Sequence, residues 1–100
     1  MIDNLFELTA KDTKTLQERA LKLCEEAGEV AQAVLSATGA PGSTYKKLEL
    51  ADVREEAVDT MIVALAVLAQ ASDSDEMFQA ELTRLLSLKV GKWQETLTRT

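Results

Sequence analysis

Residues 61–69, MIVALAVLA, decide how this sequence folds. Every side chain in this stretch is apolar, so a helix built from it has no face suited to water. A chain with three main helices is too small to cover such a helix on all sides, and another subunit must supply the missing cover. We therefore predict an all-α, antiparallel helical bundle that is completed by oligomerisation.

The apolar stretch ends a longer helical segment, which we predict from about residue 47 to residue 71. Apolar residues recur along that segment at spacings of three and four, which is the periodicity of a helix face. They are Leu50, Val53, Ala57, Met61, Ala64 and Leu68. Residues 38–44 precede the segment and contain Gly39, Pro41 and Gly42, so we predict a loop there.

Two further helices flank this segment. We predict the first from a capping pattern at Thr9 and Asp12 to about Ala37, after a short turn or helix over residues 3–8. Its apolar face is Leu16, Ala20, Leu23, Ala27, Val30 and Val34. The last helix follows the cap-rich residues 72–76 and runs to about Leu97. Its inward residues are Phe78, Leu82, Leu85, Leu86, Trp93 and Leu97.

The composition fits one globular helical domain over residues 1–100. The chain is 46% hydrophobic and only 4% aromatic, and residues that favour helix are plentiful. Its net charge of -6 argues against nucleic acid and anionic membranes as partners. The longest apolar run, residues 61–71 broken by Gln70, is too short to span a bilayer. The only cysteine, Cys24, cannot form an intramolecular disulfide, so a cytoplasmic location fits best.

Two acidic clusters lie on consecutive long helices. Glu26 and Glu29 stand three residues apart in the first, and Glu56 and Asp59 three apart in the second. Residues at this spacing share one face of a helix. Both pairs border an apolar face, where ionised carboxylates repel one another. Either some of them take up protons or cations fill the cluster. Chance acidic pairs on solvated faces are the plain alternative, because 17 of the 100 residues are acidic.

The residue types restrict which chemistry the clusters can perform. Ligand sets made only of oxygen select hard cations, Mg²⁺ first and Mn²⁺ next. The chain has no histidine, which excludes the Glu-x-x-His ligands of di-iron bundles and any nucleophile that a histidine activates. Nor does it contain a glycine-rich loop that would cradle phosphates.

The acidic residues resemble the signature of a known family. Glu25-Glu26-x-x-Glu29, then 26 residues, then Glu56-x-x-Asp59 is similar to the EExxE…ExxD motif of the MazG-like all-α nucleoside triphosphate pyrophosphohydrolases. The local strings KLCEEAGEVAQAV and DVREEAVDTMIVAL resemble the two metal-binding helices of that family. The resemblance covers roughly residues 16–68.

The resemblance implies an activity and roles for the acids. Members hydrolyse a nucleoside triphosphate between its α and β phosphates with Mg²⁺, as homodimers or homotetramers. Transferred by position, Glu26, Glu29, Glu56 and Asp59 would bind the metal, and Glu25 would orient water or bind a further ion. The alternative function is a non-catalytic helical module that binds another protein or a nucleotide.

Four further residues are candidates for contact with the substrate. Lys89 and Lys92 either face the phosphates or lie on a solvated helix face. Lys22 either contacts the substrate or pairs with Glu26 at a spacing of four. Trp93 either stacks on a base or packs in the core.

Overall fold

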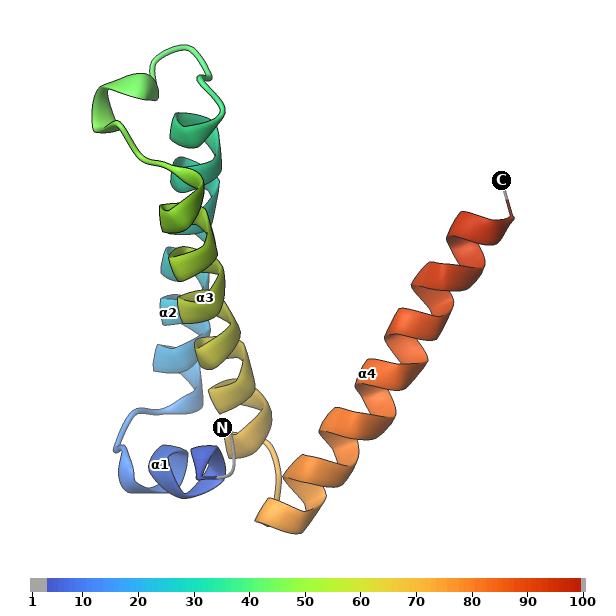
Figure 1. The fold of residues 1–100 in the computed structure, drawn as a ribbon. Helices are drawn as coiled ribbons and strands as arrows, with labels where there is room; N and C mark the ends of the chain where they lie inside the picture. The colour runs from blue at the N-terminus through green and yellow to red at the C-terminus, as the bar shows by residue number, and fades with distance from the viewer. Residues whose placement is uncertain (1–3, 100) are drawn as a thin grey trace.

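The computed structural model describes residues 4–99, and four α-helices and a short 3₁₀ turn make up its fold (Figure 1). The helices are α1 (Leu5–Lys11), α2 (Leu16–Ala37), α3 (Leu50–Gln70) and α4 (Asp75–Thr98), and the turn η1 covers Thr44–Lys46. No strand occurs among the described residues, as the sequence predicts. Residue 3, where the short N-terminal helix was expected to begin, lies outside the described residues.

Local capping sets where the helices begin and end. Thr15 Oγ1 accepts a hydrogen bond from the Glu18 amide (3.1 Å), and a Glu18 carboxylate oxygen accepts one from the Thr15 amide (2.8 Å). This reciprocal capping box starts α2. The predicted cap at Thr9 is wrong, because Thr9 lies inside α1 and donates its hydroxyl to the Leu5 carbonyl (2.8 Å).

The expected loop ends α2 in a form that requires glycine. Gly39 has a φ of 76°, and the Ala40 amide donates to the Leu35 carbonyl across the end of the helix (2.9 Å). This Schellman arrangement satisfies carbonyl groups that the last turn would leave open, and glycine adopts the left-handed conformation without strain. The chain then reverses, and α3 returns alongside α2 (Figure 1).

The face of α2 that is buried in the hairpin includes charged residues, where the sequence predicts an apolar face. The buried residues of α2 are Arg19, Glu26, Ala33 and Ser36, of which the first three recur every seven residues. The expected apolar stripe is confirmed only in part: Leu23 and Val30 are half-buried, as predicted. Ala20, Ala27 and Val34 are exposed, because each follows a buried position by one residue, or about 100° of helix rotation. Leu16 and Val34 of that stripe are 43% and 39% exposed. The acidic pair therefore borders the helix contact more closely than expected.

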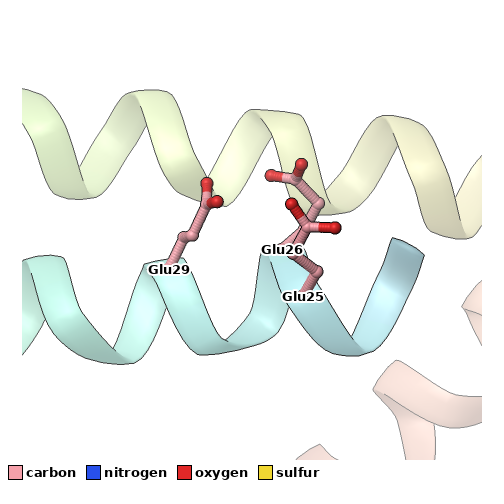
Figure 2. A group of neighbouring side chains, drawn as sticks. All are labelled: Glu25, Glu26 and Glu29. Carbon is pink, nitrogen blue, oxygen red and sulfur yellow. The ribbon is translucent and has the colours of Figure 1, made fainter. Parts of the chain in front are cut away.

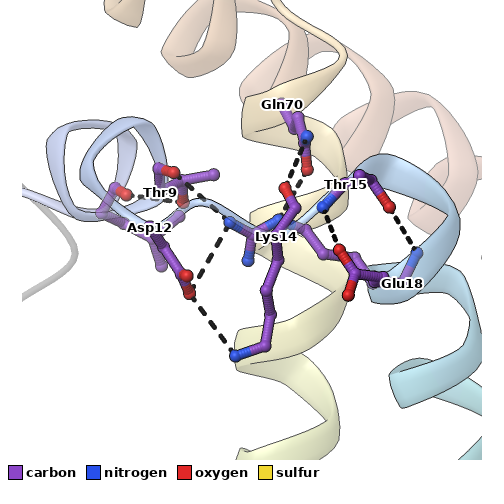
Figure 3. Close-up of polar contacts among 8 residues, drawn as sticks. Thr9, Asp12, Lys14, Thr15, Glu18 and Gln70 are labelled. Carbon is purple, nitrogen blue, oxygen red and sulfur yellow. Dashed lines mark hydrogen bonds and ion pairs between the residues drawn. The ribbon is translucent and has the colours of Figure 1, made fainter.

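A network around Arg19 holds α1 against the hairpin. The Arg19 side chain is 8% exposed; its Nε donates to Gln70 Oε1 of α3 (2.6 Å) and Nη2 donates to the Thr9 carbonyl of α1 (3.3 Å). Gln70 in turn donates to the Lys14 carbonyl (3.1 Å). Figure 3 shows how Gln70 faces the segment that joins α1 to α2. One buried guanidinium thus joins three helices.

Within the part of the chain that the structure describes, α4 packs on α1 and α3 through its first turns (Figure 1). Phe78 is fully buried, and its ring lies 6.3 Å from that of Phe6 in α1. Beyond this point α4 leads away from the hairpin and makes no close contact with α2 (Figure 1). The prediction of an inward face is therefore wrong for Trp93 and Leu97, which are 66% and 63% exposed, as it is for Leu86.

The shape is open for a chain of this length. The radius of gyration is 16.4 Å, against about 13 Å for a compact domain of 100 residues. The accessible surface is 7419 Å², against roughly 5,600 Å² for a folded monomer of this mass. Exposed apolar side chains on α2, α3 and α4 contribute to this open surface. Among the described helices, none is both long and apolar enough to cross a membrane.

Candidate metal centre

The acidic residues meet where α2 and α3 pass each other. Carboxylate oxygens of Glu26, Glu56 and Asp59 lie within 4.8 Å of one another, although two helices supply them. A second group, Glu25, Glu26 and Glu29, meets the same limit. Figure 2 shows the three glutamates of α2 extending on the side of α3. Glu26 belongs to both groups and therefore joins them.

Burial differs sharply among these acids. Glu26 is 7% exposed, whereas Glu29 and Glu56 are half-buried, and Glu25 and Asp59 are exposed. Glu26 lies deep because it occupies the line of α2 that packs on α3, seven residues after Arg19. The cluster is consequently buried at its base and open to water at Glu25 and Asp59.

Among residues 4–99, two carboxylate oxygens in the cluster are buried without a hydrogen-bond donor. They are Oε2 of Glu26 and Oε2 of Glu56, which come from opposite helices. A buried acceptor with no donor loses its hydration and gains nothing in return, which costs about 1–3 kcal/mol for a neutral group and more for a charged one. Such oxygens indicate a place for a cation or a proton.

The nearest basic side chain neutralises only part of this charge. Lys22 Nζ lies 3.1 Å from Glu26 Oε1 and 3.4 Å from Glu25 Oε1. The predicted pairing of Lys22 with Glu26 is therefore confirmed. The hydrogen bonds to Glu26 and Glu25 raise the pKa of Lys22 above its usual 10.5. Lys22 stays protonated, and the carboxylates that it pairs with, Glu25 and Glu26, both belong to α2.

The pKa of Glu56 is raised by burial and by the neighbouring carboxyl groups. Loss of hydration raises the pKa of its carboxyl above the usual 4.5, and the Glu29 carboxyl beside it adds to the shift. The charges of Asp59 and Glu26 act in the same direction. Both outcomes anticipated for the cluster, proton uptake and cation binding, would relieve this repulsion.

The donor set fits a hard divalent ion. All of the available atoms are carboxylate oxygens, which Mg²⁺ and Mn²⁺ prefer. Oxygens bound to one Mg²⁺ lie at most about 4.2 Å apart, since each is about 2.1 Å from the ion. Oxygens that already lie within 4.8 Å of one another need only small side-chain rotations to share an ion.

The predicted substrate contacts on α4 are not brought to the acids within one chain. Lys89, Lys92 and Trp93 are exposed on the part of α4 that leads away from the hairpin. Trp93 does not pack in a core in this chain, which contradicts the alternative that favoured burial. Only Lys22 of the four candidates lies at the acidic cluster.

Sequence reasoning missed Arg19, although a signal for it exists. Arg19, Glu26 and Ala33 form a line of sevenfold spacing, the same regularity that identified the apolar stripe. A search restricted to apolar residues passes over this line, because two of its members are charged.

Comparison with known proteins adds no relative: no protein family, curated protein or solved structure matches the chain.

Proposed function

We propose that this chain is a Mg²⁺-dependent nucleoside triphosphate pyrophosphohydrolase that acts on the cytoplasmic nucleotide pool. It would cleave NTP or dNTP into a monophosphate and pyrophosphate, with Mn²⁺ as a possible substitute ion. The observation that carries the proposal is the pair of buried carboxylate oxygens without donors, on Glu26 and Glu56. Their resemblance, with Glu25, Glu29 and Asp59, to the MazG-like motif supplies the reaction.

Each acid has a role that follows from its position. Glu26, Glu29, Glu56 and Asp59 would hold the ion, with Glu26 at the buried base. Mg²⁺ bound there would place positive charge against the phosphate oxygens and make a water molecule more acidic. Glu25 is exposed and has no buried oxygen to satisfy, so it can accept a proton from the attacking water.

Lys22 would change partners during substrate binding. Its side chain is 44% exposed and is held by Glu25 and Glu26. Once another cation neutralises these carboxylates, the ammonium is free to contact a phosphate oxygen. Because the lysine chain is long and flexible, this exchange requires no movement of α2.

A second copy of the chain would complete the bundle. The accessible surface exceeds that of a compact monomer by roughly 1,800 Å². Burying this excess on each of two chains gives about 3,600 Å², which lies in the range of obligate homodimers. Met61 and Ile62 on α3 are about half exposed and belong to the surface that the second copy would cover.

The same assembly would supply the missing substrate contacts. Within one chain, α4 carries Lys89, Lys92 and Trp93 away from the acids. In a dimer or tetramer, these residues would serve the acidic cluster of a neighbouring subunit, with the lysines on phosphate oxygens and the indole on the base.

One observation favours the alternative of a non-catalytic module. The far half of α4 exposes Leu86, Trp93 and Leu97, an apolar surface of the kind that binds another protein. A helical interaction module of this type needs no metal, so Mg²⁺ would not stabilise it beyond the effect of ionic strength. A module that binds nucleotides without cleaving them would bind but release no pyrophosphate.

Pyrophosphate release from a panel of common and damaged nucleoside triphosphates tests the proposal. We expect Mg²⁺-dependent turnover that Glu26→Gln and Asp59→Asn abolish, with the helical content unchanged. Glu55→Gln is the matched control, since Glu55 is exposed on α3 but belongs to neither acidic group. Full activity in Glu26→Gln or in Asp59→Asn would contradict the assigned site.

A further inference from the structure

A basic hollow lies beside the acidic cluster. Its polar rim is formed by Asp12, Lys14, Arg19 and Lys22, and Ile62 and Ala66 of α3 form its apolar floor. The volume is about 190 Å³. Sites for whole drug-sized ligands measure about 300–1,000 Å³, so the hollow suits a fragment of that size.

The charge of the hollow is opposite to that of the protein. Three cationic side chains and one carboxylate border it, whereas the whole chain carries a net charge of -6. Lys14 Nζ and Arg19 Nη2 lie 3.9 and 3.8 Å from the same Asp12 oxygen, so one carboxylate is shared between two cations. Lys22 pairs with Glu26 and Glu25, so the surplus of positive charge in the hollow comes from Lys14 and Arg19, which share one carboxylate.

Rigid and mobile groups are combined in this rim. Arg19 is fixed by its hydrogen bonds to Gln70 and Thr9 and supplies a positive charge that cannot move away. The side chains of Lys14 and Lys22 are 54% and 44% exposed, so their ammonium groups can turn toward a ligand. A fixed guanidinium flanked by two flexible ammonium groups is suited to an anion with several oxygens.

The hollow adjoins the candidate metal centre directly. Lys22 lines the hollow and also contacts Glu26 at 3.1 Å. Ile62 in the floor follows Asp59 by three residues, which places the two on the same face of α3, less than one turn apart. An anion in the hollow would therefore lie next to groups assigned to the metal.

We propose that the basic hollow is a subsite for the pyrophosphate portion of the substrate. It would hold the β and γ phosphates through Lys14 and Lys22, with Arg19 as the fixed counter-charge. Its link to hydrolysis rests on the proposed function, but its affinity for pyrophosphate does not. Neither Lys14 nor Arg19 belongs to the EExxE…ExxD signature.

Titration calorimetry with inorganic pyrophosphate in EDTA tests the subsite on the full chain, without metal or turnover. Lys14→Gln should weaken binding about threefold, the effect expected of one half-exposed charge contact. Asp12→Asn should strengthen binding about threefold, because it removes the carboxylate that Lys14 and Arg19 share and frees Lys14. General damage to the fold would not strengthen binding.

Matched controls separate this local effect from a change in net charge. Lys11→Gln changes the charge as Lys14→Gln does, and Asp73→Asn as Asp12→Asn does, but neither residue lines the hollow. We expect both controls to bind pyrophosphate like the wild type. Binding by Lys14→Gln equal to that of Lys11→Gln, or by Asp12→Asn equal to that of Asp73→Asn, would overturn the proposal.

The subsite and the proposed function fail in different ways. If the variants change pyrophosphate binding as predicted but the chain cleaves no nucleotide, the subsite is supported and the proposed function is contradicted. If the chain cleaves nucleotides but Lys14→Gln and Asp12→Asn bind pyrophosphate as their controls do, the proposed function is supported and the subsite is contradicted.

Discussion

Replacement of Glu26 by glutamine should have opposite effects on stability with and without Mg²⁺. Glu26 places one carboxylate oxygen against Lys22 and leaves the other buried without a donor. In the absence of divalent ions the charged carboxylate therefore destabilises the folded state. We expect Glu26→Gln to be more stable than the wild type in EDTA, and to gain nothing when Mg²⁺ is added.

The size of the effect follows from the burial of this side chain. Leaving a buried acceptor unpaired costs about 1–3 kcal/mol. The amide of glutamine removes the charge and adds a donor for a neighbouring carboxylate, while the lost ion pair involves a half-exposed lysine and contributes little. A net stabilisation of about 1–2 kcal/mol corresponds to a rise of roughly 5–10 °C in melting temperature. For the wild type, Mg²⁺ at one hundred times its Kd would add about 2.7 kcal/mol.

Thermal melts followed by circular dichroism measure both effects. Protein concentration must be the same throughout, because the stability of an oligomer depends on it. Sodium chloride at equal ionic strength controls for screening, and Glu55→Gln controls for the loss of one negative charge near the site. The reasoning is refuted if Glu26→Gln melts below the wild type in EDTA, or if Mg²⁺ stabilises the variant as much as the wild type.

Three other changes test separate parts of the structure. The raised pKa of Glu56 means that its protonated form favours the fold; this contribution is complete below pH 4.5 and is lost as the pH rises through the raised pKa. Denaturant melts in EDTA between pH 4 and 8 should show that loss in the wild type and not in Glu56→Gln; equal pH dependence would contradict it. Arg19→Met should destabilise the chain by about 2 kcal/mol and speed hydrogen exchange in α1, whereas unchanged exchange there would show that Arg19 does not hold α1. Met61→Glu, at a position 50% exposed, should convert the assembly to monomers in sedimentation velocity, and a monomeric wild type would remove the proposed dimer surface.

The helices themselves could be predicted because their signals are local. Periodicity located α2, α3 and α4, and the glycine at position 39 marked the end of α2. The start of α2 is predicted too early, because the Thr9 and Asp12 pattern resembles a cap although the helix begins after Thr15. Thr15 and Glu18 form the complete capping box, whereas Thr9 bonds back to Leu5 within α1.

The packing faces could not be read from hydrophobicity alone. The sequence places apolar stripes on α2 and α3, but the most buried positions of α2 are Arg19, Glu26, Ala33 and Ser36, and of its apolar stripe Leu23 and Val30 are half-buried. Apolar residues such as Met61 remain exposed, so the stripe describes a surface that a single chain does not cover. Periodic spacing therefore identifies a helix face that packs, but it does not say whether that face packs within the same chain or against another one.

The candidate site, too, could be predicted only where it depends on neighbouring helices and not on packing over long distances. The acids could be expected to converge because two adjacent antiparallel helices carry them, and carboxylate oxygens from both helices do lie within 4.8 Å. Lys89 and Trp93 lie on α4, whose direction depends on packing over long distances and not on any local pattern. The basic hollow could not be predicted from the sequence, because Asp12, Lys14 and Arg19 form no motif until α1 folds back on α3.

Identification of the reaction products by ³¹P NMR tests the central claim most directly. A nucleoside triphosphate incubated with the chain and Mg²⁺ should yield monophosphate and pyrophosphate in equal amounts, with no reaction in EDTA or with Glu26→Gln. The appearance of nucleoside diphosphate and phosphate, or the absence of turnover across the full nucleotide panel, would contradict the assignment of this acidic cluster to pyrophosphohydrolysis.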